Sequence, residues 1–357
     1  MKPLMKLLAL LLSAALLASC APKPADTTAP VSGAPTSTPT AAATPSPTPE
    51  ASTAAPSPSA QPTATEPTST AASGTTVVYE NLPDPKLWAS SLHLDAKDYP
   101  RVDGSTATLP LAVYVRSKIT GETLEQSDTF TRFTKTSNAW MALSAGQTDL
   151  LIVYEAADET KAQLDSSGVK LKAVPIGVDA LVFLTNQGNP VGNLTKQQIL
   201  DIYTGKIKKW SEVGGQDADI IPYQRPGASG SQALMVKLVM GGTPLMEAPS
   251  VLKPAEMGEL IDAVAQYENT NNALGYSVFY YVKNMYQVAG IKVLSVDGIE
   301  PTDQTIGQQR YPYTNAFYAV IREDEPADSA AHKLFDWLTG GEGQRATTDA
   351  GYSILLR

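Results

Sequence analysis

After Thr75 the sequence alternates short apolar runs with amphipathic segments, and this alternation limits the possible fold more than any other feature. Runs rich in apolar and β-branched residues, typical of buried strands, cover residues 148–155, 179–186, 273–282 and 315–323. Segments with apolar residues at helical spacing cover residues 108–120, 194–205 and 329–341. Alternation of this kind predicts an α/β fold with largely parallel or mixed sheets.

One of these helices carries clear start and stop signals. Thr195 and Gln198 stand at the spacing of a capping box, and Gly205 follows the last apolar position. We therefore expect a helix to begin just after Thr195 and to end before Gly205.

Residues 21–73 have a different composition and cannot fold in the same way. They consist almost entirely of Ala, Pro, Thr and Ser, and they contain no aromatic residue. Such a segment buries too little apolar surface to offset the entropy of ordering it. We expect residues 20–75 to form a disordered tether, which as a coil of about 55 residues would span roughly 40 Å.

The amino-terminal segment has the pattern of an export signal. Lys2 and Lys6 precede an apolar stretch of about a dozen residues, which is shorter than the roughly 20 that a membrane-spanning helix needs. Residues 17–20, Leu-Ala-Ser-Cys, resemble the lipobox of bacterial lipoproteins. We expect residues 1–19 to be a signal peptide and Cys20 to carry a lipid that anchors the chain outside the cytoplasmic membrane. A transmembrane anchor is the less favoured alternative.

Composition excludes several classes of protein. The formal net charge is −9, and no cluster of Lys and Arg is visible, which argues against a nucleic-acid partner. Cys20 is the only cysteine, so a disulfide framework within one chain is excluded.

Catalytic motifs are absent from the sequence. Residues 227–231 lack the closing glycine of a hydrolase elbow, and only His93 and His332 could serve as a base. Gly205-Lys206-Ile207 does not match a phosphate-cradling nucleotide loop. Histidine pairs at metal spacing are also missing. We expect no enzyme activity, no metal and no cofactor.

A binding segment stands out at residues 223–235, YQRPGASGSQALM. Arg225 offers a planar set of donors that matches an oxyanion, and Ser229, Gly230 and Ser231 precede a helix-like run. Hydroxyls, a close backbone and the unpaired N–H groups of a helix start together favour an anion site. In the alternative interpretation, Ser229 only caps the helix and Arg225 is a surface charge.

Two further segments place hydroxyl groups at the start of a helix. Ser105, Thr106 and Thr108 follow Asp103-Gly104, and Thr136 and Ser137 precede an apolar run. Each segment alone is compatible with ordinary capping. Taken together, the three segments could converge on one ligand.

The segment from residue 179 to residue 235 carries a resemblance to a known family. This segment resembles the phosphate-binding proteins of bacterial phosphate ABC transporters. The resemblance lies in its strand, in its helix ending in Tyr-Thr-Gly-Lys-Ile, in the tryptophan that follows and in the Arg-x-x-x-Ser-Gly-Ser pattern. Residues 273–282 and 334–352 are similar to later parts of that family, so the resemblance covers most of residues 100–357.

The resemblance implies a type II periplasmic-binding-protein fold, in which two α/β lobes close by a hinge over a ligand in the cleft between them. The first lobe would comprise residues 76–178, the second residues 179–288, and residues 289–357 would return to the first. The family pattern assigns ligand contacts to these residues: Arg225, Ser229, Gly230, Ser231, Ser137 or Thr136, and two of Ser105, Thr106 and Thr108.

One departure from the family affects the expected ligand. Phosphate-binding relatives usually carry an aspartate a few residues after the strand that corresponds to the apolar run at residues 148–155. This aspartate accepts a hydrogen from protonated phosphate and rejects sulfate. Here Tyr154 and Glu155 stand at about that place. Glu155 could substitute as the acceptor, or its shift could admit other anions.

The sequence therefore predicts an extracytoplasmic, lipid-anchored binding protein that captures phosphate or a similar oxyanion for an ABC permease. We expect it to act as a monomer. The alternative is a surface sensor or adhesion module with the same fold, which Tyr276, Tyr280, Tyr281 and Tyr286 could serve.

Overall fold

The structure is a computed structural model, and it describes residue 79, residues 82–266 and residues 271–355. The predicted signal peptide, Cys20 and the predicted tether lie outside the described residues. None of the described helices has the length and apolar content needed to cross a bilayer.

The described strands begin before the first long helix and end at Arg322, ahead of the last two helices. They are β1 (Val102–Gly104), β2 (Leu150–Tyr154), β3 (Leu171–Asn186), β4 (Asn193–Leu194), β5 (Ile221–Pro222), β6 (Ala273–Val278), β7 (Ile291–Val293), β8 (Ser295–Val296) and β9 (Thr314–Arg322).

The described helices alternate with these strands. The α-helices are α1 (Leu109–Thr120), α2 (Leu124–Phe130), α3 (Thr136–Ser144), α4 (Asp158–Ser167), α5 (Lys196–Tyr203), α6 (Gly230–Leu234), α7 (Met257–Ala265), α8 (Asp303–Gly307), α9 (Ala330–Thr339) and α10 (Gly341–Asp349). Short 3₁₀ turns are η1 (Ala96–Asp98), η2 (Thr106–Thr108), η3 (Trp210–Val213) and η5 (Ser250–Leu252), and π-helical turns are η4 (Met235–Met240) and η7 (Tyr281–Met285).

Within the described residues the strands form one mixed, seven-stranded sheet and a small sheet of β4 and β8. The order in the large sheet is β1-β2-β9-β3-β6-β5, and β7 also pairs with β3. β1 and β2 are parallel, whereas β9 is antiparallel to both β2 and β3. The predicted α/β class with a mixed sheet is confirmed.

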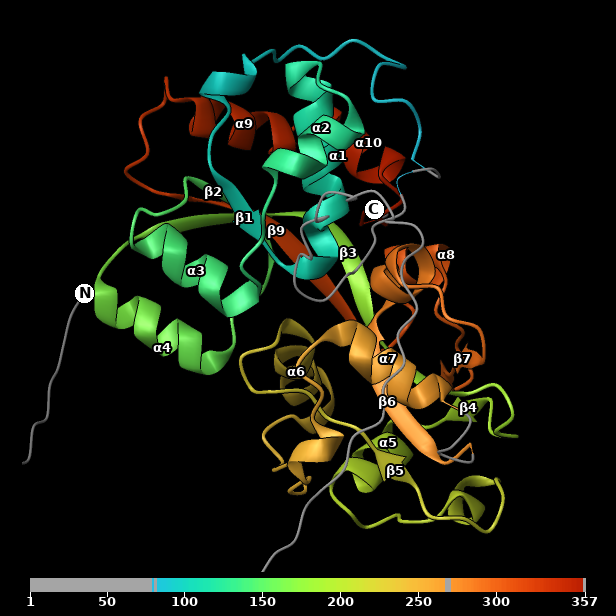
Figure 1. The fold of residues 1–357 in the computed structure, drawn as a ribbon. Helices are drawn as coiled ribbons and strands as arrows, with labels where there is room; N and C mark the ends of the chain where they lie inside the picture. The colour runs from blue at the N-terminus through green and yellow to red at the C-terminus, as the bar shows by residue number, and fades with distance from the viewer. Residues whose placement is uncertain (1–78, 80–81, 267–270, 356–357) are drawn as a thin grey trace, which may run out of the picture. The chain divides into compact units, whose positions relative to one another are not determined.

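The long strand β3 belongs to two parts of the sheet. Its residues 171–180 pair with β9, and its residues 181–186 pair with β6 and β7. We call the part built on β1, β2, β9 and residues 171–180 the first lobe. The part built on β5, β6, β7 and residues 181–186 is the second lobe. Figure 1 shows β3 leading from one group of elements to the other.

The predicted limits of the lobes, at residues 76–178, 179–288 and 289–357, stay a prediction. The strand pairing bears on the predicted return to the first lobe at residue 289. Beyond that residue, β7 still lies beside the second portion of β3, and β8 pairs with β4. The next strand, β9, pairs with β2. A return to the first lobe after Val296, in place of residue 289, fits this pairing.

Both faces of the first lobe's sheet are covered by helices. Ile152 of β2 packs in the same core cluster as Leu111 of α1, whereas its neighbour Val153 packs with Trp140 of α3 on the other face. Alternate residues of a strand point to opposite faces, so β2 is buried along its whole length. Because β1 pairs with this buried strand in parallel, the residues that follow β1 and those that follow β2 lie at the same edge of the sheet.

The predicted secondary structure is confirmed for most segments, but the strand predicted at residues 273–282 is too long. The capping box at the start of α5 is present, with Gln198 N donating to Thr195 Oγ1 at 3.1 Å. The strand predicted at residues 273–282 ends at Val278, and a π-helical turn begins at Tyr281. The apolar run continues past the strand because Tyr280 is buried against Tyr352, with ring centroids 3.5 Å apart.

Asp179 is a buried carboxylate on β3, close to the point where the strand passes between the lobes. It accepts hydrogen bonds from Tyr154 Oη at 2.6 Å, from Ala180 N at 2.7 Å and from Tyr280 N at 3.2 Å. Burial raises the pKa of Asp179 to about 6, although these hydrogen bonds oppose the rise.

This raised pKa predicts a pH-dependent contribution to stability. A carboxyl group with a raised pKa stabilises the fold fully below its ordinary pKa of 3.8, and that contribution is lost as the pH rises through about 6. From about pH 4 to about pH 7, the unfolding free energy of the wild type should fall by about 2–3 kcal/mol relative to that of Asp179→Asn. Urea denaturation at several pH values measures this difference, and parallel pH profiles would contradict it.

Candidate functional site

A small cavity lies between the two lobes at the carboxyl ends of β1 and β2. The space that the centre of a water molecule can occupy is about 40 Å³, which is room for about three waters or one small ion. Most of the residues predicted from the sequence to bind ligand line this cavity. They are Ser105, Thr106, Thr136, Arg225, Ser229, Gly230 and Ser231.

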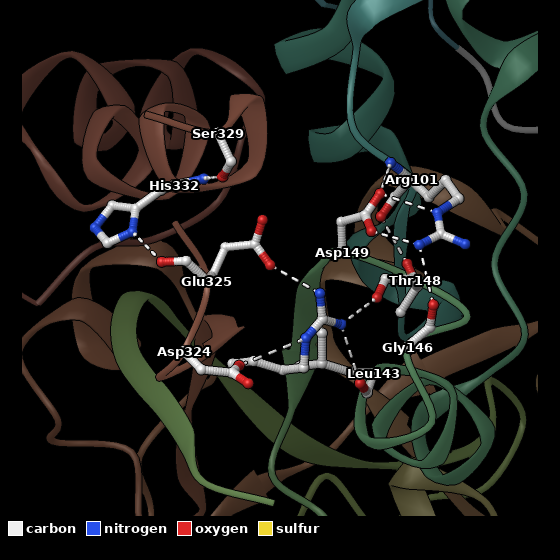
Figure 2. Close-up of polar contacts among 10 residues, drawn as sticks. Arg101, Leu143, Gly146, Thr148, Asp149, Asp324, Glu325, Ser329 and His332 are labelled. Atoms are coloured by element: carbon white, nitrogen blue, oxygen red, sulfur yellow. Dashed lines mark hydrogen bonds and ion pairs between the residues drawn. The ribbon is translucent and has the colours of Figure 1, made fainter. Parts of the chain in front are cut away.

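The opposite ends of β1 and β2 are closed by a polar cluster, which Figure 2 shows. Arg101, which precedes β1, donates to both carboxylate oxygens of Asp149, which precedes β2, at 3.0 and 2.5 Å. Arg101 also donates to Gly146 O at 3.0 Å. These contacts fix the amino ends of the two parallel strands. The cavity lies at their carboxyl ends, where α/β sheets commonly bind ligands.

Arg225 supplies a buried positive charge to the cavity. Only 5% of this residue is exposed. Its Nη2 donates to Ala255 O at 2.9 Å, but its Nε and Nη1 are buried and have no hydrogen-bond partner among the described residues. No described carboxylate lies within ion-pair distance of the guanidinium. Burial lowers the pKa of Arg225, which marks the cost of keeping this charge away from water.

The backbone at Arg225 is held by a buried hydrogen-bond network. Arg225 N donates to Gln232 Oε1 at 2.9 Å and to Tyr276 Oη at 3.0 Å. Tyr276 Oη in turn donates to Gln232 Oε1. These hydrogen bonds hold the backbone from which the Arg225 side chain extends. A side chain on a fixed backbone loses less conformational entropy when it binds an anion.

The first lobe contributes a pair of hydroxyl groups. Ser105 Oγ and Thr136 Oγ1 share a hydrogen bond of 2.8 Å, and Tyr154 N donates to Ser105 Oγ at 3.0 Å. One hydroxyl hydrogen of the pair is used between the two side chains. The other remains to be donated into the cavity.

The second lobe contributes two serines with different roles. Ser229 Oγ accepts from Gln232 N at 3.1 Å, so it caps α6 as the alternative interpretation proposed. Ser231 Oγ is buried and has no partner among the described residues. Since a buried hydroxyl without a partner is costly, Ser231 is another donor available to a ligand.

Two predicted ligand residues lie outside the cavity lining. Thr108 Oγ1 donates to Ser105 O at 2.9 Å and to Ile152 O at 2.5 Å, so it holds the turn that carries Ser105. Ser137 Oγ donates to Ala228 O at 3.2 Å, which is a contact between the lobes. Both hydroxyls shape the loops around the cavity.

Glu155, the third predicted residue outside the lining, is held by two lysines. It accepts from Lys161 Nζ at 2.7 Å and forms an ion pair with Lys237 of the second lobe. Burial alone would raise the pKa of Glu155, but the hydrogen bonds from Lys161 and Lys237 lower it overall. The structure thus brings Glu155 to the edge of the interface between the lobes and not into the cavity.

The lobes are in contact around the cavity. Lys135 Nζ of the first lobe lies 2.5 Å from Glu256 Oε1 of the second. Gly230 lies so close to Thr136 that a Cβ atom on Gly230 would be 2.5 Å from Thr136 Oγ1. The structure is therefore a closed arrangement in which little space remains between the lobes.

Several residues that line the cavity were not predicted from the sequence to contact the ligand. They are Ala107, Lys135, Tyr154, Glu256, Met257, Val278 and Tyr281. The sequence carries no comparable signal for Glu256, because Glu is not among the residues preferred at the start of a helix. Among the described residues, no group of three or more His, Cys, Asp or Glu is placed to hold a metal ion.

Comparison with known families agrees with this two-lobe arrangement. A family model described as a PBP superfamily domain matches residues 60–342. The chain belongs to the PBP superfamily. The resemblance inferred from the sequence is thereby confirmed, and so is the two-lobe fold class.

Curated relatives of this PBP superfamily chain include phosphate-binding proteins. The phosphate-binding protein PstS of Bacillus subtilis is 25% identical over 258 residues, which cover 70% of this chain and 79% of the relative. PstS of Borreliella burgdorferi is 25% identical over 206 residues, which cover 56% of this chain and 71% of the relative.

Solved structures of similar fold point the same way. A putative phosphate ABC transporter substrate-binding protein with bound phosphate from Clostridium perfringens is 26% identical. It matches with a TM-score of 0.55 over 71% of this chain and 98% of the other. An ABC-type phosphate transport receptor from Vibrio cholerae, 22% identical, has the same TM-score and coverage and supports the fold alone.

Proposed function

We propose that this chain captures inorganic phosphate, or a similar small oxyanion, between its lobes and delivers it to an ABC permease. The observation that carries the proposal is the Arg225 guanidinium, which is buried and keeps two nitrogen positions without a partner among the described residues. A buried charge is stable only when it is compensated. A small anion in the cavity would compensate it and would also satisfy Ser231 Oγ.

The names of the relatives support phosphate in particular. The curated relatives from Bacillus subtilis and Borreliella burgdorferi are both phosphate-binding proteins, and the Clostridium perfringens structure contains bound phosphate. The size of the cavity also favours an ion of a few heavy atoms over a larger organic ligand.

The proposed ligand contacts follow from the cavity lining. Arg225 would bind two oxygens of the anion, and hydroxyls from both lobes would bind the others. A ligand held in this way bridges the lobes and stabilises the closed arrangement. The proposed donors are Arg225, Ser105, Thr106, Thr136, Ser229, Ser231 and the backbone at Gly230, with Thr108, Ser137 and Glu155 in supporting positions.

The proposed location is the extracytoplasmic face of the membrane. The export signal at residues 1–19 and the lipobox at Cys20 support a lipid anchor, and residues 21–75 would hold the lobes clear of the bilayer. We propose that the chain acts there as a monomer and as a binding protein without catalysis.

A display or adhesion role has less support. Three of the four tyrosines on which that alternative rested, Tyr276, Tyr280 and Tyr281, are each at most 4% exposed. The fourth, Tyr286, is partly buried, and its hydroxyl donates to Asp262 Oδ2 at 2.6 Å. Buried tyrosines stabilise a core and cannot recognise another protein.

Phosphate should raise the melting temperature of the purified chain, because a ligand that binds only the folded state stabilises it by mass action. At a hundred times the dissociation constant we expect a rise of about 5 °C. Thermal-shift measurements with phosphate, sulfate, molybdate and phosphonates test this. The proposal fails if none of these anions shifts the melting temperature.

A further inference from the structure

Asp179 lies where β3 passes from the first lobe to the second. It pairs with Asn315 of β9, and two residues later Leu181 begins the pairing of β3 with β6. Only 3% of Asp179 is exposed, and this residue is not part of the cavity lining. Its carboxylate is therefore buried between the lobes, and it accepts hydrogen bonds from elements of both.

The first lobe contributes Tyr154, the last residue of β2. Tyr154 Oη donates to Asp179 Oδ2 at 2.6 Å, so this hydroxyl is already used and does not need a ligand. The main chain of the same residue reaches the anion site, because Tyr154 N donates to Ser105 Oγ at 3.0 Å. Ser105 Oγ shares a hydrogen bond with Thr136 Oγ1. Asp179 is thus linked through one tyrosine to the hydroxyl pair of the first lobe.

The second lobe contributes the segment that follows β6. Tyr280 N donates to Asp179 Oδ1 at 3.2 Å. Val278, at the end of β6, and Tyr281, at the start of η7, both line the cavity and lie within two residues of Tyr280. The hydrogen bond to Asp179 therefore fixes the backbone of this wall of the cavity.

A further contact joins Tyr280 to the turn that carries Ser105. The Tyr280 ring stacks on the Tyr352 ring, with centroids 3.5 Å apart. Tyr352 Oη donates to Ala107 O at 2.7 Å, and Ala107 lines the cavity. One buried cluster thus contacts both walls of the cavity. We call it the hinge cluster, and its members are Asp179, Tyr154, Tyr280 and Tyr352.

We infer that Asp179 is a positioning residue for the anion site, which holds the cavity walls of the two lobes in their binding arrangement through Tyr154 and Tyr280. This inference rests on the proposed function. Asp179 acts on the ligand only through the other members of the hinge cluster. The apparent affinity of a site falls in proportion to the fraction of molecules in the binding arrangement. Loss of these hydrogen bonds should therefore weaken binding although every donor in the lining is still present.

The Tyr154→Phe variant removes the hydroxyl that Asp179 accepts from and keeps the backbone N–H that donates to Ser105. Inorganic phosphate is the probe, and the dissociation constant of the full chain is measured by calorimetry. We expect Tyr154→Phe to bind phosphate about tenfold more weakly than the wild type, because fewer molecules hold their cavity walls in place.

Tyr286→Phe is the matched control for this variant. It also removes a hydroxyl that donates to a carboxylate at 2.6 Å, but Tyr286 and Asp262 both belong to the second lobe and lie outside the lining. We expect this control to bind phosphate within about twofold of the wild type. Melting temperatures without ligand are measured for both variants. If Tyr154→Phe lowers the melting temperature and leaves the dissociation constant unchanged, its hydroxyl is merely structural and the inference is overturned.

Variants of Asp179 itself provide a rescue test. Asp179→Asn keeps an oxygen that can accept from Tyr280 N, and its amide group can donate to Tyr154 Oη. We expect it to bind phosphate within about threefold of the wild type, whereas Asp179→Ala should bind about tenfold more weakly. Wild-type affinity in a folded Asp179→Ala variant would overturn the inference. If Asp179→Ala does not fold, the comparison of Tyr154→Phe with Tyr286→Phe decides the question.

A double-mutant cycle tests whether Asp179 and Tyr154 act together. In the Asp179→Ala background, Tyr154→Phe should cost little further affinity, because the hydrogen bond between the two side chains is already absent. Losses that simply add would show that the two residues act independently, and they would overturn the inference.

The proposed function and this inference fail in different ways. If the wild type does not bind phosphate, sulfate, molybdate or phosphonates, the proposed function is wrong and the inference falls with it. If the wild type binds phosphate and Tyr154→Phe binds it equally well, only the positioning role of Asp179 is wrong.

Discussion

Replacing Arg225 with alanine should abolish measurable binding of phosphate. The guanidinium is the only cation in the described lining that is not paired with a carboxylate, and its Nε and Nη1 have no other partner there. Charge-assisted, bidentate hydrogen bonds of this kind contribute several kcal/mol, so we expect affinity to fall by about a hundredfold or more. Calorimetry that detects phosphate heat for the parent should detect none for Arg225→Ala.

Arg225→Ala should reduce the stability of the unliganded fold much less than it reduces the affinity for phosphate. Removing a buried charge that lacks an ion-pair partner relieves a desolvation cost, which offsets the packing lost with the side chain. We expect the melting temperature without ligand to change by no more than about 3 °C, while the rise caused by phosphate is lost. This pattern separates a binding defect from a folding defect.

Arg101→Ala is a suitable control. Arg101 pairs with Asp149 at the amino ends of β1 and β2, and about 60% of its side chain is exposed. An exposed ion pair contributes about 1 kcal/mol or less, so this variant should keep the full rise with phosphate. Equal phosphate affinity in Arg225→Ala and the parent would refute the role of Arg225.

The fold was predictable where the signals are local. The burial of β2 follows from a short apolar run, and the start of α5 follows from Thr195 and Gln198. The full length of β3 was not predictable in this way, since its first portion contains the exposed Lys172 and a bulge near Pro175. That portion is a strand because β9 pairs with it, and β9 lies more than a hundred residues further along the chain.

The candidate site was predictable for similar reasons. Arg225, Ser229, Gly230 and Ser231 stand together in the sequence at the start of a helix, so their chemistry is visible without a structure. The pair of Lys135 and Glu256 joins residues 121 positions apart, and neither segment alone indicates a ligand. Glu155 was expected near the ligand because of its place after β2. Two lysines hold it elsewhere, and one of them, Lys237, belongs to the other lobe.

Gly230 should be essential for closing the lobes over the ligand. A Cβ atom at this position would lie 2.5 Å from Thr136 Oγ1 and 3.4 Å from Thr136 Cβ. Thr136 cannot turn away without breaking its hydrogen bond to Ser105. We therefore expect Gly230→Ala to hold the lobes apart and to weaken phosphate binding by up to about a hundredfold, in line with the cost of overpacking.

The matched control lies in the same loop. Gly227 has open space around its Cβ position and lacks a positive φ, so Gly227→Ala should bind phosphate like the parent. The contact is tested further by a double-mutant cycle with Thr136→Ala, which removes the atom that a Cβ at position 230 would strike. Gly230→Ala should cost much less affinity in that background than in the parent. An equal cost in both would mean that Gly230 matters for another reason, such as the approach of its backbone to the anion.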